Sequence, residues 1–233
     1  MPAYNEERLI EATIRRCVDS LQRAVGRFEI ILVDDCSSDR TPELADHLGR
    51  ELASVRVVHN QQNLRQGGSI QKGFGLATCD LVTHNAMDCP FDFDDLPKVL
   101  QHFPEADIVV VTRQSYPGVS SARRCVSWVN RTLIRVLFRT GISDYNFVQV
   151  YKRSVLEQLP CFSTATAFVT VERIVRAHHA GFRVVAVEAD YHRREVGVST
   201  SGNWRVVRDS LRDMVRLWLE LRGLPPGRQA GEE

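Results

Sequence analysis

The sequence predicts an α/β protein with a mainly parallel sheet flanked by helices, and three observations support this prediction. Short apolar runs alternate with amphipathic segments through the first 116 residues. The runs Phe28–Val33 and Asp107–Thr112 are apolar almost throughout, which is typical of strands covered on both faces. Acidic residues follow two of the expected strands: Asp34 and Asp35 follow one, and Asp88 follows another. In such folds ligands bind at the carboxyl ends of the strands.

The first half shows the clearest alternation of strands and helices. A strand is expected over 28–33, and the helix expected over 41–53 has Thr41 as its N-cap and Pro42 at its first position. Strands expected over 55–59 and 80–85 enclose a helix over 68–78. A helix over 94–102, with acidic residues in its first turn, then leads to the strand over 107–112.

The second half is richer in helix and more irregular. Helices are expected over 122–140 and 203–222, where apolar residues recur at helical spacing between arginines. A third helix over 166–180 is closed by Gly181 as its C-cap, and the strand 183–188 (RVVAVE) follows. Strands that alternate with helices in this way predict the α/β class.

Composition and charge narrow the class further. The chain has 233 residues, 43% hydrophobic and 25% charged, which fits one domain over 1–222 with a flexible tail over 223–233. These values exclude a disordered chain, a fibre and an integral membrane protein. The formal charge of +1 hides a division, because residues 1–116 carry a net charge of −6 and residues 117–233 carry +7. We expect no nucleic-acid partner.

The cysteines and the amino-terminal segment indicate a cytoplasmic protein. The six cysteines are scattered and form no CxxC pair, which is typical of reduced thiols in a cytosolic protein. The first residues, MPAYNEER, are charged where a signal peptide has its apolar core. No run of about 18 apolar residues exists that would span a bilayer.

Four segments, in order, resemble the family 2 glycosyltransferases, and in particular their dolichyl- or polyprenyl-phosphate mannosyltransferase branch. The resemblance covers roughly residues 1–205, and its second segment is the most specific. The segments are the loop PAYNEE from Pro2, the signature VDDCSSDRT over Val33–Thr41, the residues Asn63, Gly67, Gly73, Ala77 and Asp80, and REVGVS over Arg194–Ser199. The resemblance implies the GT-A fold, with a nucleotide- and metal-binding half over 1–116 and an acceptor half over 117–222.

The same resemblance implies that the acidic half binds a nucleotide-diphosphate sugar. Asp35 is expected to accept hydrogen bonds from the base and Asp34 to support it, while Pro2, Tyr4 and Glu6 line the pocket. Two adjacent carboxylates at a strand end repel each other, which suggests that a ligand relieves them. The alternatives are that Asp34, Asp35 and Asp39 cap the next helix, and that a helix begins at Asn5 with acidic residues in its first turn.

The expected metal motif departs from the family pattern. Family members have Asp-x-Asp, often followed by Gln two residues later, whereas this chain has Asp88-Cys89-Pro90-Phe91-Asp92. Asp88 and Asp92 are expected to bind Mg²⁺ or Mn²⁺, because such a cation needs only one or two carboxylates beside a diphosphate and water. Asp88 also has the expected catalytic role. The alternative is a weakened metal site.

Arginines of the basic half are expected at the acceptor phosphate. The resemblance places Arg123, Arg124, Arg153 and Ser199 there and gives Arg194 a catalytic role, since guanidinium groups bind phosphate in a bidentate manner. The family's Phe, Arg and Lys at three nearby positions are Val148, Gln149 and Thr200 here. Glu172 ranks below Asp88 as a further site residue.

Tryptophans beside arginines on two helices fit two interpretations. Trp128, Trp204 and Trp218 fit core-packing faces, and they also fit helices in an anionic headgroup layer. Peripheral contact at the cytoplasmic membrane face is the expected extent of any attachment.

The resulting hypothesis is an inverting, metal-assisted transfer of a sugar, mannose or glucose, from a nucleotide-diphosphate sugar to a polyprenyl phosphate. Transfer to a soluble hydroxyl acceptor, and a non-catalytic module that binds nucleotide sugars, are the alternatives. Family members have an apolar strand before the loop, whereas this sequence starts at Met1-Pro2. We expect either that the start lies further upstream or that the sheet lacks a central strand.

Overall fold

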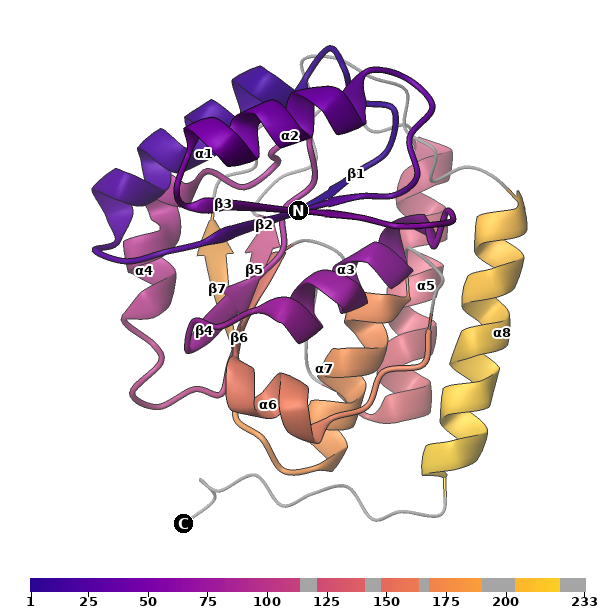
Figure 1. The fold of residues 1–233 in the computed structure, drawn as a ribbon. Helices are drawn as coiled ribbons and strands as arrows, with labels where there is room; N and C mark the ends of the chain where they lie inside the picture. Colours follow the sequence, from indigo (N-terminus) through magenta and orange to yellow (C-terminus); the bar gives the residue numbers. More distant parts are fainter. Residues whose placement is uncertain (114–120, 141–147, 164–167, 190–203, 223–233) are drawn as a thin grey trace.

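The computed structural model describes residues 1–113, 121–140, 148–163, 168–189 and 204–222, and these form two sheets with helices around them (Figure 1). Sheet A has the order β1-β2-β3, and all its strands are parallel. Sheet B has the order β4-β6-β5-β7, in which β6 alone is antiparallel to its neighbours. The strands are β1 (Pro2–Ala3), β2 (Ile30–Asp34), β3 (Val55–His59), β4 (Leu81–Thr83), β5 (Ile108–Arg113), β6 (Val148–Lys152) and β7 (Val184–Ala189).

Helices connect and cover the strands. They are α1 (Ile10–Ala24), α2 (Thr41–Glu51), α3 (Arg65–Leu76), the 3₁₀ helix η1 (Phe93–Asp95), α4 (Leu96–Leu100), α5 (Ser121–Phe138), α6 (Arg153–Gln158), α7 (Val169–His179) and α8 (Trp204–Leu221). In the described part of the chain, no helix is both long and apolar enough to cross a membrane.

Sheet A lies between helices on its two faces. Helices α1 and α2 lie on one face and α3 on the other (Figure 1). Gly49 lets α2 lie close to β3, because a Cβ atom at this position would be 2.8 Å from Val57 Cγ2. The strand β2 is consequently buried along its whole length, as its apolar sequence predicts.

Sheet B packs against a core cluster on each of its faces. Successive residues of β5 point to opposite sides and enter different clusters. Val109 and Val111 belong to a core cluster with α1, η1 and α4. Ile108 and Val110 belong to a second cluster with α3, α5, α7 and α8. The acidic and basic halves are also linked at the surface, where Arg65 at the start of α3 forms a 3.1 Å ion pair with Asp209 of α8.

The structure confirms the α/β class and most predicted elements. Gly181 has a φ of 83° directly after α7, and Phe182 N donates to Ala177 O at 3.0 Å, which confirms the predicted glycine C-cap. The expected helix start was wrong by one residue at Thr41. This residue begins α2, and its hydroxyl accepts from Glu6 N instead of a helix N–H.

Three parts of the architecture differ from the expectation. The antiparallel strand β6 was not expected, the helix considered from Asn5 begins at Ile10, and the described strands form two sheets instead of one. The start of the chain is a short strand, since Pro2 and Ala3 pair in parallel with Val33 and Asp34. The expected tail over 223–233 lies outside the described residues.

Candidate active site

Two loops leave the carboxyl edge of sheet A side by side. Ala3 is the register partner of Asp34, and Asp35 N donates to Ala3 O at 2.8 Å. The loop after β1 therefore starts beside the loop after β2. This edge is where parallel α/β sheets bind ligands.

Hydrogen bonds hold the two loops together. Asn5 N donates to Ser37 Oγ at 3.0 Å, and Ser38 N donates to Asn5 Oδ1 at 2.9 Å. The Asp39 carboxylate accepts from Thr41 N at 2.9 Å and from Glu7 N at 3.2 Å. Asp39 thus binds the N–H of the first residue of α2, although Arg40 is the N-cap of that helix, and the same carboxylate joins the two loops.

Asp35 is buried at this edge with one of its oxygens already bound. Its Oδ1 accepts from Asn60 Nδ2 and from Leu64 N, both at 2.8 Å. Among the described residues, no hydrogen bond to Oδ2 of Asp35 is found. Asn60 is itself fixed by Ser69 and by Lys72, whose Nζ lies 2.7 Å from Asn60 Oδ1. The carboxylate is therefore oriented by its own chain.

Asp34 is paired with a histidine that the sequence analysis did not single out. Oδ2 of Asp34 lies 3.0 Å from His59 Nδ1, and the other ring nitrogen lies 3.1 Å from Asp46 Oδ1. The hydrogen bond to Asp34 raises the pKa of His59, against the effect of desolvation, and Asp46 adds to the rise. Asp34 and Asp35 already have partners within the chain, His59 and Asn60, so their proximity does not by itself require a ligand. The position of His59 and Asn60 at the carboxyl end of β3 was the available signal.

The pKa of His59 gives a first testable prediction. The pKa of His59 is raised in the folded state. Its contribution to the stability of the fold is therefore fully present below about pH 6.5 and is lost as the pH rises through the folded-state pKa. We expect NMR titration of the ring protons of His59 to give a pKa above 6.5. Asp46→Asn should lower that pKa, whereas a value unchanged in this variant would contradict the assigned cause.

Asp88 lies in a turn that follows β4 and packs against α1. Thr13 Oγ1 of α1 donates to Met87 O at 2.8 Å, and Asn85 Nδ2 closes the turn by donating to Phe91 O at 2.9 Å. Asp88 is half-buried there. Asp92 caps η1, since its Oδ1 accepts from Asp94 N at 3.0 Å.

The donors of this turn fit a hard divalent cation. A carboxylate oxygen is the preferred ligand of Mg²⁺ and Mn²⁺, and the soft thiol of Cys89 points instead to Cys17, 3.4 Å away. Within the described ranges, no group of three or more His, Cys, Asp or Glu residues is arranged to hold a metal. A cation would therefore need further oxygen ligands from a bound diphosphate and water.

The other expected nucleotide residues lie on the first loop. Pro2 belongs to β1, Tyr4 is half exposed, and Glu6 N donates to Thr41 Oγ1 at 2.8 Å. The helix expected from Asn5 begins only at Ile10, and Asn5 itself has a φ of 55°. Pro2, Tyr4 and Glu6 are thus at the same edge as Asp34 and Asp35.

The structure does not bring Arg153 to this edge. Lys152 pairs with Leu81 at the amino end of β4, and Arg153 N donates to Asp80 O at 2.7 Å. Asp88 follows the other end of β4, so Arg153 lies at the wrong end of the strand for the expected acceptor role. Its guanidinium pairs with Glu157 at 3.0 Å.

Glu172 has a structural role in place of the one considered for it. Its carboxylate is buried and accepts from Phe162 N, Ser163 N and Arg176 Nε, the last at 2.7 Å. Burial raises the pKa of Glu172, but these hydrogen bonds outweigh that effect and lower it. Arg194 and Ser199 lie outside the described residues. Arg123 and Arg124 belong to α5, but their side chains are not described.

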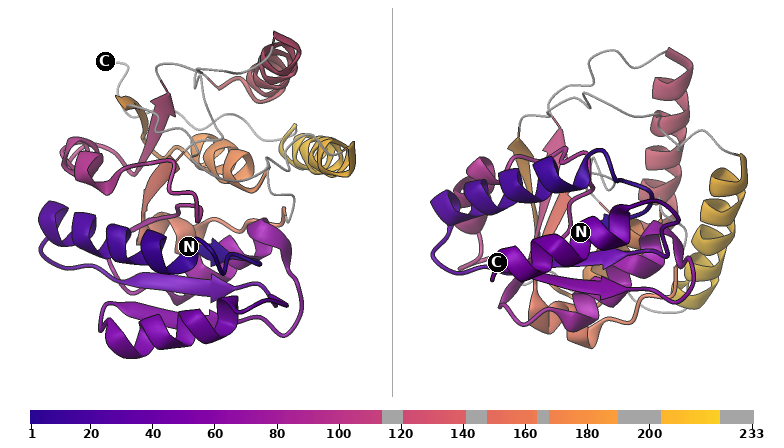
Figure 2. Two further views of the ribbon diagram at one scale, coloured as in Figure 1. Left: turned by 90° about the horizontal axis from the view of Figure 1, so that it is seen from above. Right: turned by 45° about the horizontal axis from the view of Figure 1, so that its top comes forward.

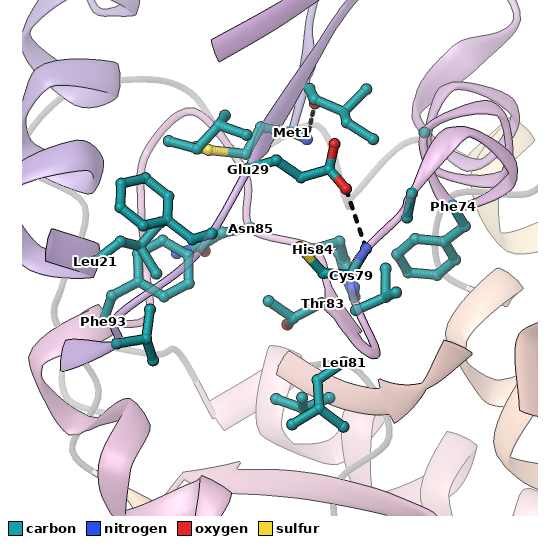
Figure 3. A pocket seen from close by; sticks show the side chains of 18 of the residues that line it. Met1, Leu21, Glu29, Phe74, Cys79, Leu81, Thr83, His84, Asn85 and Phe93 are labelled. Atoms are coloured by element: carbon teal, nitrogen blue, oxygen red, sulfur yellow. Dashed lines mark hydrogen bonds between the residues drawn. The ribbon is translucent and has the colours of Figure 1, made fainter. Parts of the chain in front are cut away.

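A cavity of about 420 Å³ lies between β2, α3 and β4 (Figure 3). Its lining includes Ile30 and Ile31, which begin β2, so it is at the opposite end of that strand from Asp34. His84 lines it, and burial lowers the pKa of this histidine to about 4. This part of the cavity lies away from the acidic edge, although Ser69, which accepts from Asn60, also lines the cavity.

The sheets, the covering helices and the acidic carboxyl edge together are those of the GT-A fold. A mannosyltransferase from Pyrobaculum calidifontis, solved with GDP-Man and Mn²⁺, superimposes with a TM-score of 0.68 at 16% identity, over 97% of this chain and 64% of that one. Glucosyl-3-phosphoglycerate synthase from Mycobacterium tuberculosis, solved with Mn²⁺ and UDP, gives 0.68 at 20% identity, over 96% and 77%. The chain belongs to glycosyl transferase family 2, whose model matches residues 1–160.

Curated relatives of similar sequence extend the comparison. Glycosyltransferase AglD of Haloferax volcanii is 29% identical over 97% of this chain and 37% of its own length. A dodecaprenyl-phosphate galacturonate synthase of Rhizobium johnstonii is 28% identical over 91% and 64%. An undecaprenyl-phosphate mannosyltransferase of Micrococcus luteus is 27% identical over 85% and 84%. The chain thus spans less than two thirds of the first two relatives and most of the third.

Proposed function

We propose that this chain is an inverting hexosyltransferase that moves a sugar, mannose or glucose, from a nucleotide-diphosphate sugar to a polyprenyl phosphate with the help of Mg²⁺ or Mn²⁺. Two relatives carry polyprenyl-phosphate acceptors in their names, which supports this acceptor class. The observation that carries the proposal is the carboxyl edge itself, where the buried Asp35 is held by Asn60 beside the loop of Tyr4.

The nucleoside is assigned to the loops of sheet A. Asn60 and Leu64 hold Oδ1 of Asp35, and we assign Oδ2 to the ring N–H of the base. A carboxylate fixed in this way loses little side-chain entropy on binding. The pocket is also lined by Pro2, Tyr4 and Glu6, and Asp34, which is held by His59, supports Asp35.

Asp88, with Asp92 beside it, would hold the divalent cation. When bound, the cation offsets the charge that develops on the leaving diphosphate. The turn is kept in place by Thr13 and Asn85, so that Asp88 is positioned before the donor arrives.

The acceptor needs positioning more than it needs a base. A phosphate monoester has its second pKa at about 6 and is already anionic near neutral pH. The attacking phosphate is therefore held, against the repulsion of the diphosphate, by Arg194, Arg123, Arg124 and Ser199.

Asp35→Asn tests the donor site. The amide oxygen can still accept from Asn60 and Leu64, but the charge facing the base is lost. We expect calorimetry with GDP or UDP sugars and Mn²⁺ to show about 10- to 100-fold weaker binding, the value of a charged hydrogen bond. Asp46→Asn, at the far side of His59, is the matched control. Equal affinities of wild type and Asp35→Asn would overturn the role of Asp35.

We also propose that the protein contacts the membrane surface through α5 and α8, which lie along the same flank (Figure 2). The flank exposes Trp128, Val129, Leu133 and Val136 of α5, and Leu211, Val215 and Leu219 of α8. Exposed arginines, among them Arg135, Arg212 and Arg216, lie on the same helices and complement anionic headgroups. Ile134 and Phe138 of α5 pack in the core. One face of α5 is therefore a core-packing face, and in this proposal the opposite face contacts the headgroups.

Vesicle sedimentation tests this contact. Trp128 is 61% exposed, and we expect Trp128→Ala to bind phosphatidylglycerol vesicles about tenfold or more weakly, since burying a large apolar side chain contributes roughly 2 kcal/mol. Trp128→Phe should retain most of the binding. Sedimentation of wild type no greater than with neutral phosphatidylcholine vesicles would contradict the proposed role of charge.

The metal motif also fits an alternative, a non-catalytic module that binds nucleotide sugars. Pro90 stands at the position of the family's second metal carboxylate, and Asp92 is engaged in capping η1. Tight binding of a nucleotide sugar without any dependence on a divalent metal, together with no turnover, would favour this alternative.

A further inference from the structure

Two buried thiols meet next to the turn that carries Asp88. Cys17 of α1 is 1% exposed and Cys89 is 7% exposed, and their sulfur atoms are 3.4 Å apart. The two residues are 72 positions apart in the sequence, so the contact exists only because α1 packs on the turn after β4. Both are free thiols in the structure.

The surroundings of this pair are polar on the side of Cys89. Asn85 Nδ2 donates toward Cys89 Sγ at 3.3 Å, and the thiol lies 3.5 Å from Phe91 O. The backbone at Cys89 has a φ of 43°, an uncommon conformation for a residue other than glycine. Cys89 directly follows Asp88. Met87, which precedes Asp88, accepts a hydrogen bond from Thr13 through its backbone oxygen.

We propose that Cys17 and Cys89 form a redox-active thiol pair, which hydrogen peroxide converts to a disulfide that ties the turn of Asp88 to α1. The sulfur of Cys89 attacks the peroxide, its S–H and the O–O bond break, and a sulfenic acid and water are formed. The thiol of Cys17 then attacks that sulfur, the S–S bond forms, and the sulfenic oxygen leaves as a second water.

Closure of the bond requires a small movement with a large local consequence. A disulfide has a sulfur–sulfur distance of about 2.04 Å, so the two atoms must approach by roughly 1.4 Å from their present contact. Cys17 lies within the buried face of α1 and Cys89 lies in the turn, so the bond would tie the turn covalently to the helix. Oxidation therefore acts on the residue next to Cys89, and the coupling to metal binding rests on the proposed function of Asp88.

Mass spectrometry of the intact protein and its peptides tests the pair without reference to activity. After treatment with hydrogen peroxide, we expect a peptide that links Cys17 to Cys89, absent after reduction with dithiothreitol. The thermal unfolding midpoint should rise by roughly 5 °C or more, because the crosslink closes a long loop. Cys17→Ala should lose the linked peptide, whereas Cys79→Ser, a matched change of a thiol outside the pair, should retain it.

The outcomes separate this proposal from the function of the site. Free, alkylatable thiols at both positions in peroxide-treated wild type would overturn the pair, whatever the activity. If the disulfide forms, the Mn²⁺ concentration for half-maximal nucleotide-sugar binding should change about fivefold or more, at the low end of coupling between linked sites. An unchanged metal dependence in the oxidised protein would overturn the coupling alone. Metal-independent binding in both states would contradict the proposed function and leave the peptide evidence for the pair intact.

Discussion

Asp88→Asn is expected to lower sugar transfer by about 10³-fold, which corresponds to about 4 kcal/mol of lost transition-state stabilisation. The substitution keeps the size of the side chain and removes the charge that would hold the cation at the leaving diphosphate. The turn itself should persist, because Thr13 and Asn85 fix it through other atoms. Initial rates at saturating donor, measured over a range of Mn²⁺ concentrations, give the comparison.

Asp94→Asn is the matched control for this experiment. Asp94 lies six residues further on, in η1, and forms an exposed ion pair with Arg23 at 2.8 Å. Loss of this pair should leave transfer unchanged, because exposed pairs contribute little to stability and Asp94 has no part in the site. Activity of Asp88→Asn equal to that of Asp94→Asn would remove Asp88 from the mechanism.

Glu172→Ala should lower the free energy of unfolding by about 3–5 kcal/mol, as expected when one partner of a buried ion pair is removed. The carboxylate is 2% exposed and lies 2.7 Å from Arg176 Nε, whose side chain is also buried. The substitution also leaves Phe162 N and Ser163 N without their acceptor. Denaturation with urea, followed by circular dichroism, measures the change.

The pH dependence and a surface variant check this assignment. The pKa of Glu172 is lowered from 4.5 in the folded state, so its contribution is present above about pH 4.5 and is lost as the pH falls below it. The difference between wild type and Glu172→Ala should therefore shrink in acid. Glu157→Ala, which removes an exposed partner of Arg153, should cost less than about 1 kcal/mol. Equal losses in the two variants would show that the network of Glu172 is not a core feature.

Local sequence patterns predicted the strands and the acidic edge well. The strand β2 is a continuous apolar run that ends in two aspartates, and both the burial of the strand and the position of Asp34 and Asp35 follow from that pattern. Gly181 was readable as a C-cap because glycine, without a Cβ atom, adopts the left-handed conformation at no steric cost. Such features depend on near neighbours in the chain.

Features that depend on distant contacts were not readable in the same way. The contact of Asp34 with His59 requires β2 and β3 to be paired in register, with Asp34 opposite His59. The position of Arg153 depends on β6 running antiparallel to β4, which puts the arginine at the far end from Asp88. The contact of Cys17 with Cys89 depends on the packing of α1. The end of an expected strand indicates which residues lie at the edge of the sheet, but a single sequence does not show which strand or helix lies beside it.

Transfer of a sugar to a polyprenyl phosphate can be measured directly in one assay. Radiolabelled GDP and UDP sugars are incubated with the protein, a polyprenyl phosphate and a soluble hydroxyl acceptor, with and without Mg²⁺ or Mn²⁺, and the products are separated by solvent extraction. We expect the label in the organic phase, in an acid-labile product in which the sugar is linked to the lipid phosphate. This product should form only when a divalent metal is present. Label on the hydrophilic acceptor, with none on the lipid, would contradict transfer to a polyprenyl phosphate.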